Sequence, residues 1–330
     1  MNLKEDLRKW PFQLAILFGT LVLFLIANTL LRNNPSLSFV PPFLGILIVI
    51  EIIFFVTLEV KEGAQKHGWK HEAVDTVIAL AVALAIWYGA SFVLNTSTPI
   101  SGVVSCSMLP NLQRGDFVIV QGAPINAYGI SMTPDELASL NGKAMVEYGG
   151  ANISIDGSLF PYCLRNRNQS VCQAFIQSPD SVLERKGAFA YRYERCPLSL
   201  SGGGSASEPC LKSITFHGTE YLTNFSHDTI VYQPAPGDVY SVVGDIVHRV
   251  FFVIDVDGKK YYLTRGDNNP ILDLQVYDYG NGAVNTPIAQ DKVRGRVLAR
   301  IPLLGYFKLF ISGYFNEDPQ CKMQLEFTHN

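Results

Sequence analysis

Three short stretches of the chain carry a hydroxyl, an imidazole and two carboxylates that together could hydrolyse a peptide bond. Ser107 lies in SGVVSCSMLPNLQRGD, His248 in GDIVHRVFFV, and Asp267 and Asp273 in TRGDNNPILD. A Ser hydroxyl is a poor nucleophile near neutral pH, so a neutral imidazole must accept its proton during attack and return it to the leaving amine. A carboxylate bonded to the other ring nitrogen fixes the tautomer. We expect Asp273 to be that acid, with Asp267 as the second candidate.

Each stretch taken alone also has a simpler explanation. A Ser before Met-x-Pro is usually a turn residue, and a single His in a strand is usually a structural side chain. The segment GDNNPILD could be a β-turn or part of a calcium loop, since Asp and Asn oxygens suit that ion. It lacks the ligand spacing and the closing Glu of an EF-hand. The combination and order of the three stretches on one chain therefore carry the argument for catalysis.

Together the three stretches resemble the conserved boxes of type I signal peptidases, in the form found in archaea and in the catalytic subunit of the endoplasmic-reticulum signal peptidase complex. Those proteins carry a Ser-x-Ser-Met box, an Ile-Val-His-Arg-Val box and a Lys-Gly-Asp-Asn-Asn box that ends in Asp. The matching segments here are SCSMLPNLQRGD, VGDIVHRV and TRGDNNPILD. A fourth segment, RGRVLARIPLLGYF at 294–307, is similar to the Gly-Arg-x-x-x-x-Pro-x-x-Gly segment that follows in the family. The resemblance covers about 95–122 and 236–312.

The resemblance implies a role for each matching residue. Ser107 matches the nucleophile, and His248 matches the general base, where bacterial signal peptidases have Lys. Asp273 matches the third member of the triad, and Asp267 matches a second important acid. Ser105 matches the residue whose hydroxyl joins the backbone N–H of the nucleophile in the oxyanion hole. Such donors commonly contribute roughly 3–4 kcal/mol to stabilising the transition state.

The chain departs from the family at three positions of these boxes. Cys106 replaces the usual Gly between the two serines, Leu109 takes a place that is often acidic, and Arg265 replaces Lys before Gly-Asp. Cys106 is itself an alternative nucleophile, as in a cysteine protease. The boxes nevertheless assign the reactive position to Ser107.

A membrane anchor is predicted for the first third of the chain. The 330 residues have a formal net charge of −3, and only 17% are charged, against roughly 25% in soluble proteins. Segments 11–31, 39–58 and 76–94 each supply about the 20 apolar residues that a membrane-spanning helix needs. This pattern excludes a simple soluble enzyme. The nearly balanced charge also gives no sign of the basic surface that nucleic-acid-binding proteins use.

Basic residues predict the orientation of these three helices, because Lys and Arg accumulate in cytoplasmic loops. Three basic residues precede the first segment, one follows it at Arg32, and three lie between the second and third segments. The N-terminus is then cytoplasmic, and everything after Asn95 is extracytoplasmic. Glu51 lies within the second segment, where an acid is either a functional site or a hydrogen-bonded contact between helices.

The region after Pro99 is typical of antiparallel β structure, with short runs rich in Val, Ile, Tyr and Phe between turn residues. Asp257-Gly258 predicts a hairpin, and TPDELASL at 133–140 predicts a capped helix. The expected strands are 102–105, 116–121, 189–194, 229–233, 238–243, 246–255 and 260–264. The expected fold is transmembrane α-helices (1–95), then a mainly antiparallel β catalytic core (96–122 and 236–312), an inserted α+β subdomain (123–235) and a C-terminal tail (313–330).

Four cysteines lie within the predicted insertion: Cys163, Cys172, Cys196 and Cys210. On an extracytoplasmic domain they favour disulfides, of which three pairings are possible, and 163–172 with 196–210 is the local one. A zinc site is the alternative, although the spacings do not resemble a Cys-x₂₋₄-Cys knuckle.

The resemblance implies a membrane-bound serine endopeptidase that removes N-terminal signal peptides from secreted and membrane preproteins. Its partners would be signal peptides, the lipid bilayer and, as a further candidate, the protein translocon; no metal or organic cofactor is implied. One alternative is a catalytically silent relative that binds signal peptides or supports a secretion complex. Another is a processing protease of the same mechanism with a narrower set of precursors.

Overall fold

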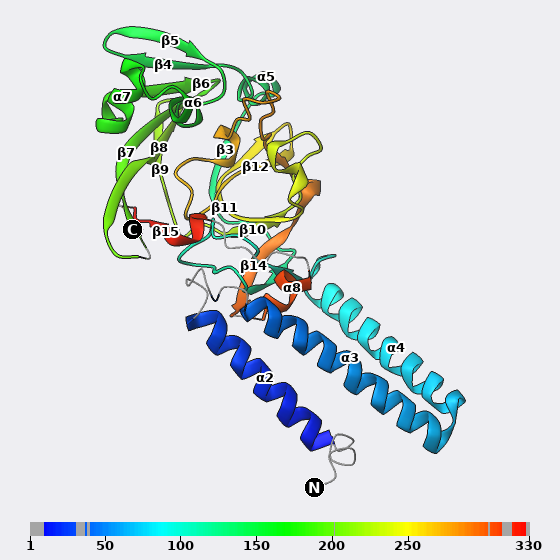
Figure 1. The fold of residues 1–330 in the computed structure, drawn as a ribbon. Coiled ribbons are helices and arrows are strands. Elements are labelled where there is room, and N and C mark those ends of the chain that lie inside the picture. The colour runs from blue at the N-terminus through cyan, green and yellow to red at the C-terminus, as the bar shows by residue number, and fades with distance from the viewer. Residues whose placement is uncertain are drawn as a thin grey trace. The chain divides into compact units, whose positions relative to one another are not determined.

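The computed structural model describes residues 10–30, 37, 40–200, 202–302, 304–311 and 319–327 (Figure 1). They fall into two compact units. The first lies within Met1–Ala90 and Leu309–Phe315, and the second lies within Ser91–Lys308 and Asn316–Asn330.

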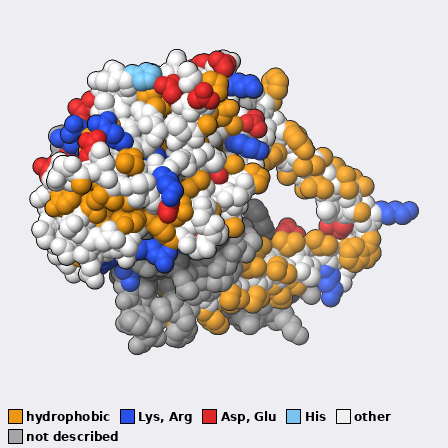
Figure 2. All heavy atoms as spheres, turned by 90° about the horizontal axis from the view of Figure 1, so that it is seen from above, with side chains coloured by type: hydrophobic (Ala, Val, Ile, Leu, Met, Phe, Trp, Pro, Cys, Tyr) orange, Lys and Arg blue, Asp and Glu red, His pale blue; other side chains and the backbone are white. Residues whose placement is uncertain are grey.

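The first unit consists mainly of long apolar helices: α2 (Trp10–Leu30), α3 (Val40–His67) and α4 (Trp69–Val93). Two segments, Phe43–Lys66 and Trp69–Val93, are long and apolar enough to cross a membrane. Figure 2 shows hydrophobic side chains along the helical part of the surface, where Ile86 and Phe92 are among the most exposed. These features agree with the second and third predicted spans. The first predicted span, 11–31, lies in α2 as far as Leu30, and Pro11–Phe24 is a described apolar segment of this helix.

Glu51 is part of a polar contact between α2 and α3. The Thr20 hydroxyl donates a hydrogen bond to Glu51 Oε1 over 2.9 Å. An acid in an apolar helix is costly without a donor. This geometry corresponds to the hydrogen-bonded interhelical contact that the sequence left open.

The first sheet of the second unit has eight strands and carries the predicted boxes. Its order is β1-β2-β14-β10-β11-β12-β13, and β3 pairs in parallel with β11, whereas the other pairs are antiparallel. The hairpin between β11 and β12 turns at Asp257-Gly258, where both residues have positive φ, as predicted. The strands are β1 (Ile100–Gly102), β2 (Phe117–Gln121), β3 (Tyr128–Ser131), β10 (Thr229–Tyr232), β11 (Ile246–Val256), β12 (Lys259–Arg265), β13 (Ile288–Ala289) and β14 (Val293–Ile301).

The second sheet has seven strands in the order β5-β4-β6-β7-β8-β9, with β15 added beside β7. Its strands are β4 (Ala144–Tyr148), β5 (Ala151–Ile155), β6 (Leu183–Lys186), β7 (Phe189–Leu200), β8 (Ser205–Phe216), β9 (Thr219–Leu222) and β15 (Met323–Leu325). The other helices and turns are α5 (Pro134–Ser139), α6 (Leu159–Arg165), α7 (Ser170–Gln177), α8 (Tyr306–Ile311), η1 (Pro179–Ser181), η2 (Val239–Val242), η3 (Asp273–Gln275), η4 (Gln290–Lys292) and η5 (Pro319–Lys322). The predicted capping box of Thr133 and Glu136 forms at α5.

Region 123–235, which the sequence predicts to be an insertion, shares its core with the first sheet. Two strands within 123–235, β3 and β10, belong to the first sheet. Buried residues from β7, including Phe189 and Tyr193, pack in one cluster with Phe252 of β11 and Leu274 of η3. The part that forms the second sheet is therefore bounded by β3 and β10, and it supports the first sheet directly.

Two predicted strands differ from the structure. The segment 238–243 forms the 3₁₀ turn η2, because Gly237 and Gly244 bend the chain with positive φ at both of its ends. The first strand ends at Gly102, before most of 102–105.

Three disulfides join the six cysteines. Cys163–Cys172 links α6 to α7, and Cys196–Cys210 links β7 to β8, which is the local pairing. The third bond, Cys106–Cys321, spans 215 residues and ties the predicted C-terminal tail to the loop that carries Ser107.

Candidate active site

Ser107, His248 and Asp273 form one hydrogen-bonded chain. His248 Nε2 lies 2.9 Å from Ser107 Oγ, and His248 Nδ1 lies 2.7 Å from Asp273 Oδ2. All three residues are buried, and Ser107 is the least so at 9% exposed. With the proton on Nδ1, the imidazole donates to Asp273 and can accept the Ser107 proton at Nε2.

Three different kinds of local structure position these side chains: a strand, a 3₁₀ turn and a loop. His248 lies on β11, opposite Ile230 of the neighbouring β10, and Asp273 begins η3. Ser107 lies in the loop between β1 and β2, where the buried side chain of Met108 packs in a cluster with Val118. A regular strand thus carries the base, and a loop anchored by an apolar side chain carries the hydroxyl.

The Gly-Asp-Asn segment after β12 holds the Ser107 loop through backbone contacts. The Asn268 N–H donates to the Ser107 carbonyl over 2.7 Å, and Asn268 Nδ2 donates to the Cys106 carbonyl over 3.1 Å. A Cβ at Gly266 would lie 2.5 Å from the Ser107 carbonyl oxygen. Only glycine allows this close approach, so Gly266 and Asn268 explain why TRGDNN accompanies the serine.

Asp273 receives two further donors that sequence reasoning did not identify. The Tyr232 hydroxyl donates to Asp273 Oδ2 over 2.9 Å, and the Thr264 hydroxyl donates to the same oxygen over 2.5 Å. Tyr232 occurs in an ordinary strand-forming run, and Thr264 is the first residue of the TRGDNNPILD stretch at the end of β12. Their positions in the sheet, and not the motif, show that both hydroxyls contact Asp273. Burial, and then the charge of Asp273, raises the pKa of Tyr232, which keeps its phenol protonated.

Asp267 lies in a different network, away from His248. Arg249 forms a bidentate pair with it, with Nε 2.7 Å from Oδ1 and Nη2 2.7 Å from Oδ2. Asn111 Nδ2 also donates to Oδ2 over 2.7 Å. Asp267 therefore joins one residue from each of the other two boxes, and Asp273 is the acid that contacts the imidazole.

Ser105 lies beside the candidate nucleophile. Its Oγ is 3.1 Å from Ser107 Oγ. A hydroxyl at this place is suitably close to donate to an oxygen that becomes negative during attack by Ser107. Its role in an oxyanion hole stays a prediction.

Cys106 is not available as the alternative nucleophile. Its side chain is buried and bonded to Cys321, so it has no thiolate.

The alternative metal sites have no free set of ligands among the described side chains. Glu194, Cys196 and Cys210 form the one cluster with suitable spacing there, but the two cysteines are bonded to each other. In the GDNNPILD segment, Asp267 and Asp273 accept hydrogen bonds from protein donors. Neither acid belongs to a group of candidate metal ligands among the described residues.

Comparison of the sequence with protein-family models finds no matching family, and comparison with curated proteins finds no matching relative.

Proposed function

We propose that this protein is a membrane-bound serine endopeptidase that cleaves N-terminal signal peptides from translocated preproteins. The observation that carries the proposal is the continuous chain from Ser107 Oγ through His248 to Asp273 Oδ2, with hydrogen bonds of 2.9 and 2.7 Å. The order of these residues in the three boxes supports the same assignment.

In the proposed reaction, Ser107 Oγ attacks the scissile carbonyl carbon while His248 Nε2 takes the hydroxyl proton. The carbonyl oxygen becomes negative and is stabilised by the Ser107 N–H and the Ser105 hydroxyl. His248 then gives the proton to the leaving amine, and the peptide C–N bond breaks to leave an acyl-Ser107 ester. Water, deprotonated by His248, hydrolyses the ester and restores the Ser107 hydroxyl.

The apolar helices and the disulfides support the proposed substrate and location. About a dozen residues separate α4 from Ser107, which limits their separation to at most ~50 Å. A signal peptide keeps its apolar segment in the bilayer and its cleavage site just outside, within that reach. Three disulfides among the six cysteines favour an oxidising compartment, which fits an extracytoplasmic catalytic domain.

The test is cleavage of a purified secretory preprotein by the full chain in detergent. Wild type is compared with Ser107→Ala and with the control Ser101→Ala, which changes a buried serine on β1 outside the hydrogen-bonded chain. We expect Ser107→Ala to lose at least about 10³-fold in rate and Ser101→Ala to stay within a few-fold. Mass spectrometry of the products should locate the cut after a small side chain at the end of the signal peptide.

Three outcomes would contradict the proposal in different ways. Equal cleavage by wild type and Ser107→Ala would exclude Ser107 as the nucleophile. Folded wild type that binds the preprotein without cutting it would favour a silent relative. Ser107-dependent cleavage confined to one class of precursor would favour a narrower processing protease.

A further inference from the structure

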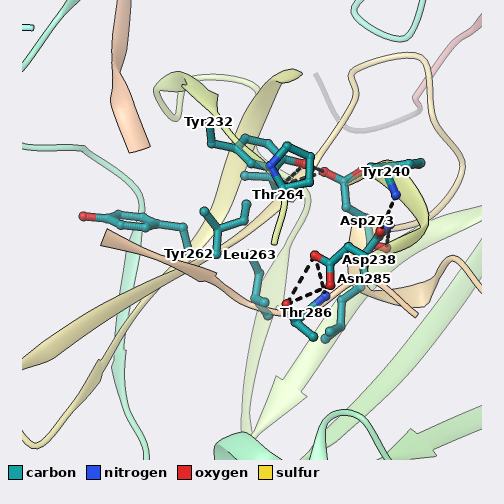
Figure 3. Close-up of a pocket in the computed structure, with 12 residues that line it drawn as sticks. Tyr232, Asp238, Tyr240, Tyr262, Leu263, Thr264, Asp273, Asn285 and Thr286 are labelled. Carbon is teal, nitrogen blue, oxygen red and sulfur yellow. Dashed lines mark hydrogen bonds between the residues drawn. The ribbon is translucent and has the colours of Figure 1, made fainter. Parts of the chain in front are cut away.

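The two oxygens of the Asp273 carboxylate differ sharply in their hydrogen bonds. Its Oδ2 lies within hydrogen-bonding distance of His248 Nδ1, the Tyr232 hydroxyl and the Thr264 hydroxyl. Its Oδ1 is buried and has no hydrogen-bond partner in the described part of the chain. Figure 3 shows Tyr232 and Thr264 beside Asp273 at one side of a small pocket. One oxygen of the acid therefore carries all of its contacts.

The two hydroxyls come from the strands on either side of the one that carries His248. Tyr232 lies on β10 and Thr264 on β12, and both strands pair with β11. In the register, Tyr232 is opposite Ile246 and Thr264 is opposite Val250, two residues to either side of His248 along the strand. Strands hold side chains more precisely than loops do, so the donors have a fixed geometry relative to the imidazole.

Hydroxyl donors have two effects on a carboxylate in such a place. They restrict its rotation, and they place the positive ends of two dipoles next to its charge. Both effects act on His248, because the carboxylate orients the ring and its negative charge favours the imidazolium. Because the two hydroxyl donors stabilise the Asp273 carboxylate, they weaken its attraction for the extra proton of the His248 imidazolium.

We propose that Tyr232 and Thr264 are positioning residues that fix Asp273 toward His248 and limit the proton affinity of the imidazole. The inference rests on the proposed function, in which His248 is the general base. It adds Tyr232 of β10, which lies outside the three boxes, and gives a role to Thr264 of β12, the first residue of TRGDNNPILD. In a purely structural role, the two hydroxyls would only provide hydrogen bonds to a buried acid and would not affect His248.

The surroundings of His248 leave few other groups that could change its proton affinity. The titratable and charged groups nearest to it are Asp273, Tyr232 and the ring of Tyr240, which lies 6.4 Å from the imidazole. Its chain neighbour Arg249 is paired with Asp267. Burial lowers the pKa of Arg265 to about 10, so that side chain keeps its charge at neutral pH. Removing the two hydroxyls takes no charged group out of these surroundings.

The experiment compares Tyr232→Phe, Thr264→Val and the double variant with Thr264→Ser, which keeps the donor. The matched control is Tyr262→Phe: Tyr262 lines the same pocket but points away from Asp273 (Figure 3). We expect each donor-free variant to lose about 10-fold in kcat and the double variant about 100-fold, with KM nearly unchanged. The acidic limb of kcat/KM should move to higher pH, because a more negative site binds the imidazole proton more tightly. Thr264→Ser and Tyr262→Phe should retain the wild-type profile.

An activity-independent measurement accompanies the kinetics. NMR of selectively ¹⁵N-histidine-labelled full chain in detergent reports the titration of His248, and its midpoint should rise in the double variant. If wild type cleaves through Ser107 but neither the pH profile nor this midpoint moves, the positioning role is wrong and the proposed function stands. If the midpoint rises in a protein that cleaves nothing, the proposed function fails while the electrostatic effect of the donors remains.

Discussion

Two buried carboxylates, Asp273 and Glu184, have similar surroundings but different connections. Glu184 on β6 is fully buried, accepts hydrogen bonds at Oε2 from the Tyr193 hydroxyl and the Leu159 N–H, and has no partner at Oε1 in the described chain. Asp273 likewise receives its donors at a single oxygen. One donor of Asp273 is an imidazole whose other nitrogen contacts Ser107. The Glu184 network instead ends inside the core.

This difference shows that burial alone does not identify a catalytic acid. Burial raises the pKa of Glu184 and lowers the pKa of its neighbour Lys186. Perturbed groups of this kind are often used to find functional sites, yet the hydrogen bonds printed for Glu184 come from Tyr193 and Leu159 and lead to no imidazole in the described structure. The Asp273 region differs because a continuous chain of hydrogen bonds runs from the acid to a base and then to a hydroxyl.

The two networks meet at the turn that carries Asp273. Gln275 Nε2 donates to the Tyr193 hydroxyl over 2.7 Å, and Gln275 Oε1 accepts from the Leu272 N–H over 3.1 Å. The second sheet therefore holds η3 by a hydrogen bond as well as by the shared apolar core. Region 123–235 therefore helps to hold the turn that carries Asp273.

The largest expected effect separates the two acids. Asp273→Asn should reduce kcat by about 10³–10⁴-fold, because the amide cannot hold the same imidazole tautomer. Glu184→Gln should keep cleavage within about three-fold, since its side-chain oxygen can still accept from Tyr193 and Leu159. Preprotein cleavage and thermal unfolding of both variants check this. An equal loss of activity in a stably folded Glu184→Gln would remove the distinction.

A second prediction compares the disulfides of the two regions. Loop-closure entropy assigns about 5 kcal/mol to the 215-residue separation of Cys106–Cys321 and about 3 kcal/mol to the 9-residue separation of Cys163–Cys172. Cys321→Ser should therefore destabilise the protein more than the Cys163→Ala/Cys172→Ala pair does. Cys321→Ser should also lower the activity of the protein that remains folded, because Cys106 directly precedes Ser107 and the disulfide restrains that loop. Unfolding in denaturant and cleavage measured below the transition test both statements.

A smaller effect concerns the link between the networks. Tyr193→Phe should reduce the free energy of unfolding by about 1–3 kcal/mol, because Glu184 and Gln275 each lose a buried partner. Tyr191→Phe is the matched control, since the buried Tyr191 hydroxyl has no hydrogen-bond partner among the described residues. That control should be neutral or slightly stabilising. Similar losses in both variants would mean that the hydrogen bonds to Tyr193 contribute nothing specific.

The smallest effect is a dependence of stability on pH. Burial lowers the pKa of His227, whose ring lies 4.4 Å from that of Tyr128. The unfolded chain therefore takes up a proton before the folded one does, and stability falls as pH drops below about 6.5, the ordinary value for His. Thermal unfolding between pH 7.5 and 5 should show a shallower decline for His227→Gln than for wild type. Parallel curves would exclude this residue as a source of acid sensitivity.

The sequence allowed the three boxes and the β-rich domain to be predicted because short motifs and alternating apolar residues are local signals. The choice between Asp267 and Asp273 depends on Arg249 and Asn111, which reach one acid and leave the other for His248. Such a choice needs side-chain geometry across three segments. For the same reason, Tyr232, the place of β10 in the first sheet and the bond from Cys106 to Cys321 depend on long-range pairing that no local pattern contains.

The Cys106–Cys321 bond also imposes an order on biosynthesis. A ribosome makes Cys106 long before Cys321, which follows 215 positions later. The loop that carries Ser107 therefore receives its covalent restraint only after the chain has been made as far as Cys321 and both cysteines have reached an oxidant. A nascent or truncated chain that stops before Cys321 has the three boxes without this restraint. Synthesis through Cys321 is thus a precondition for the finished form of the Ser107 loop.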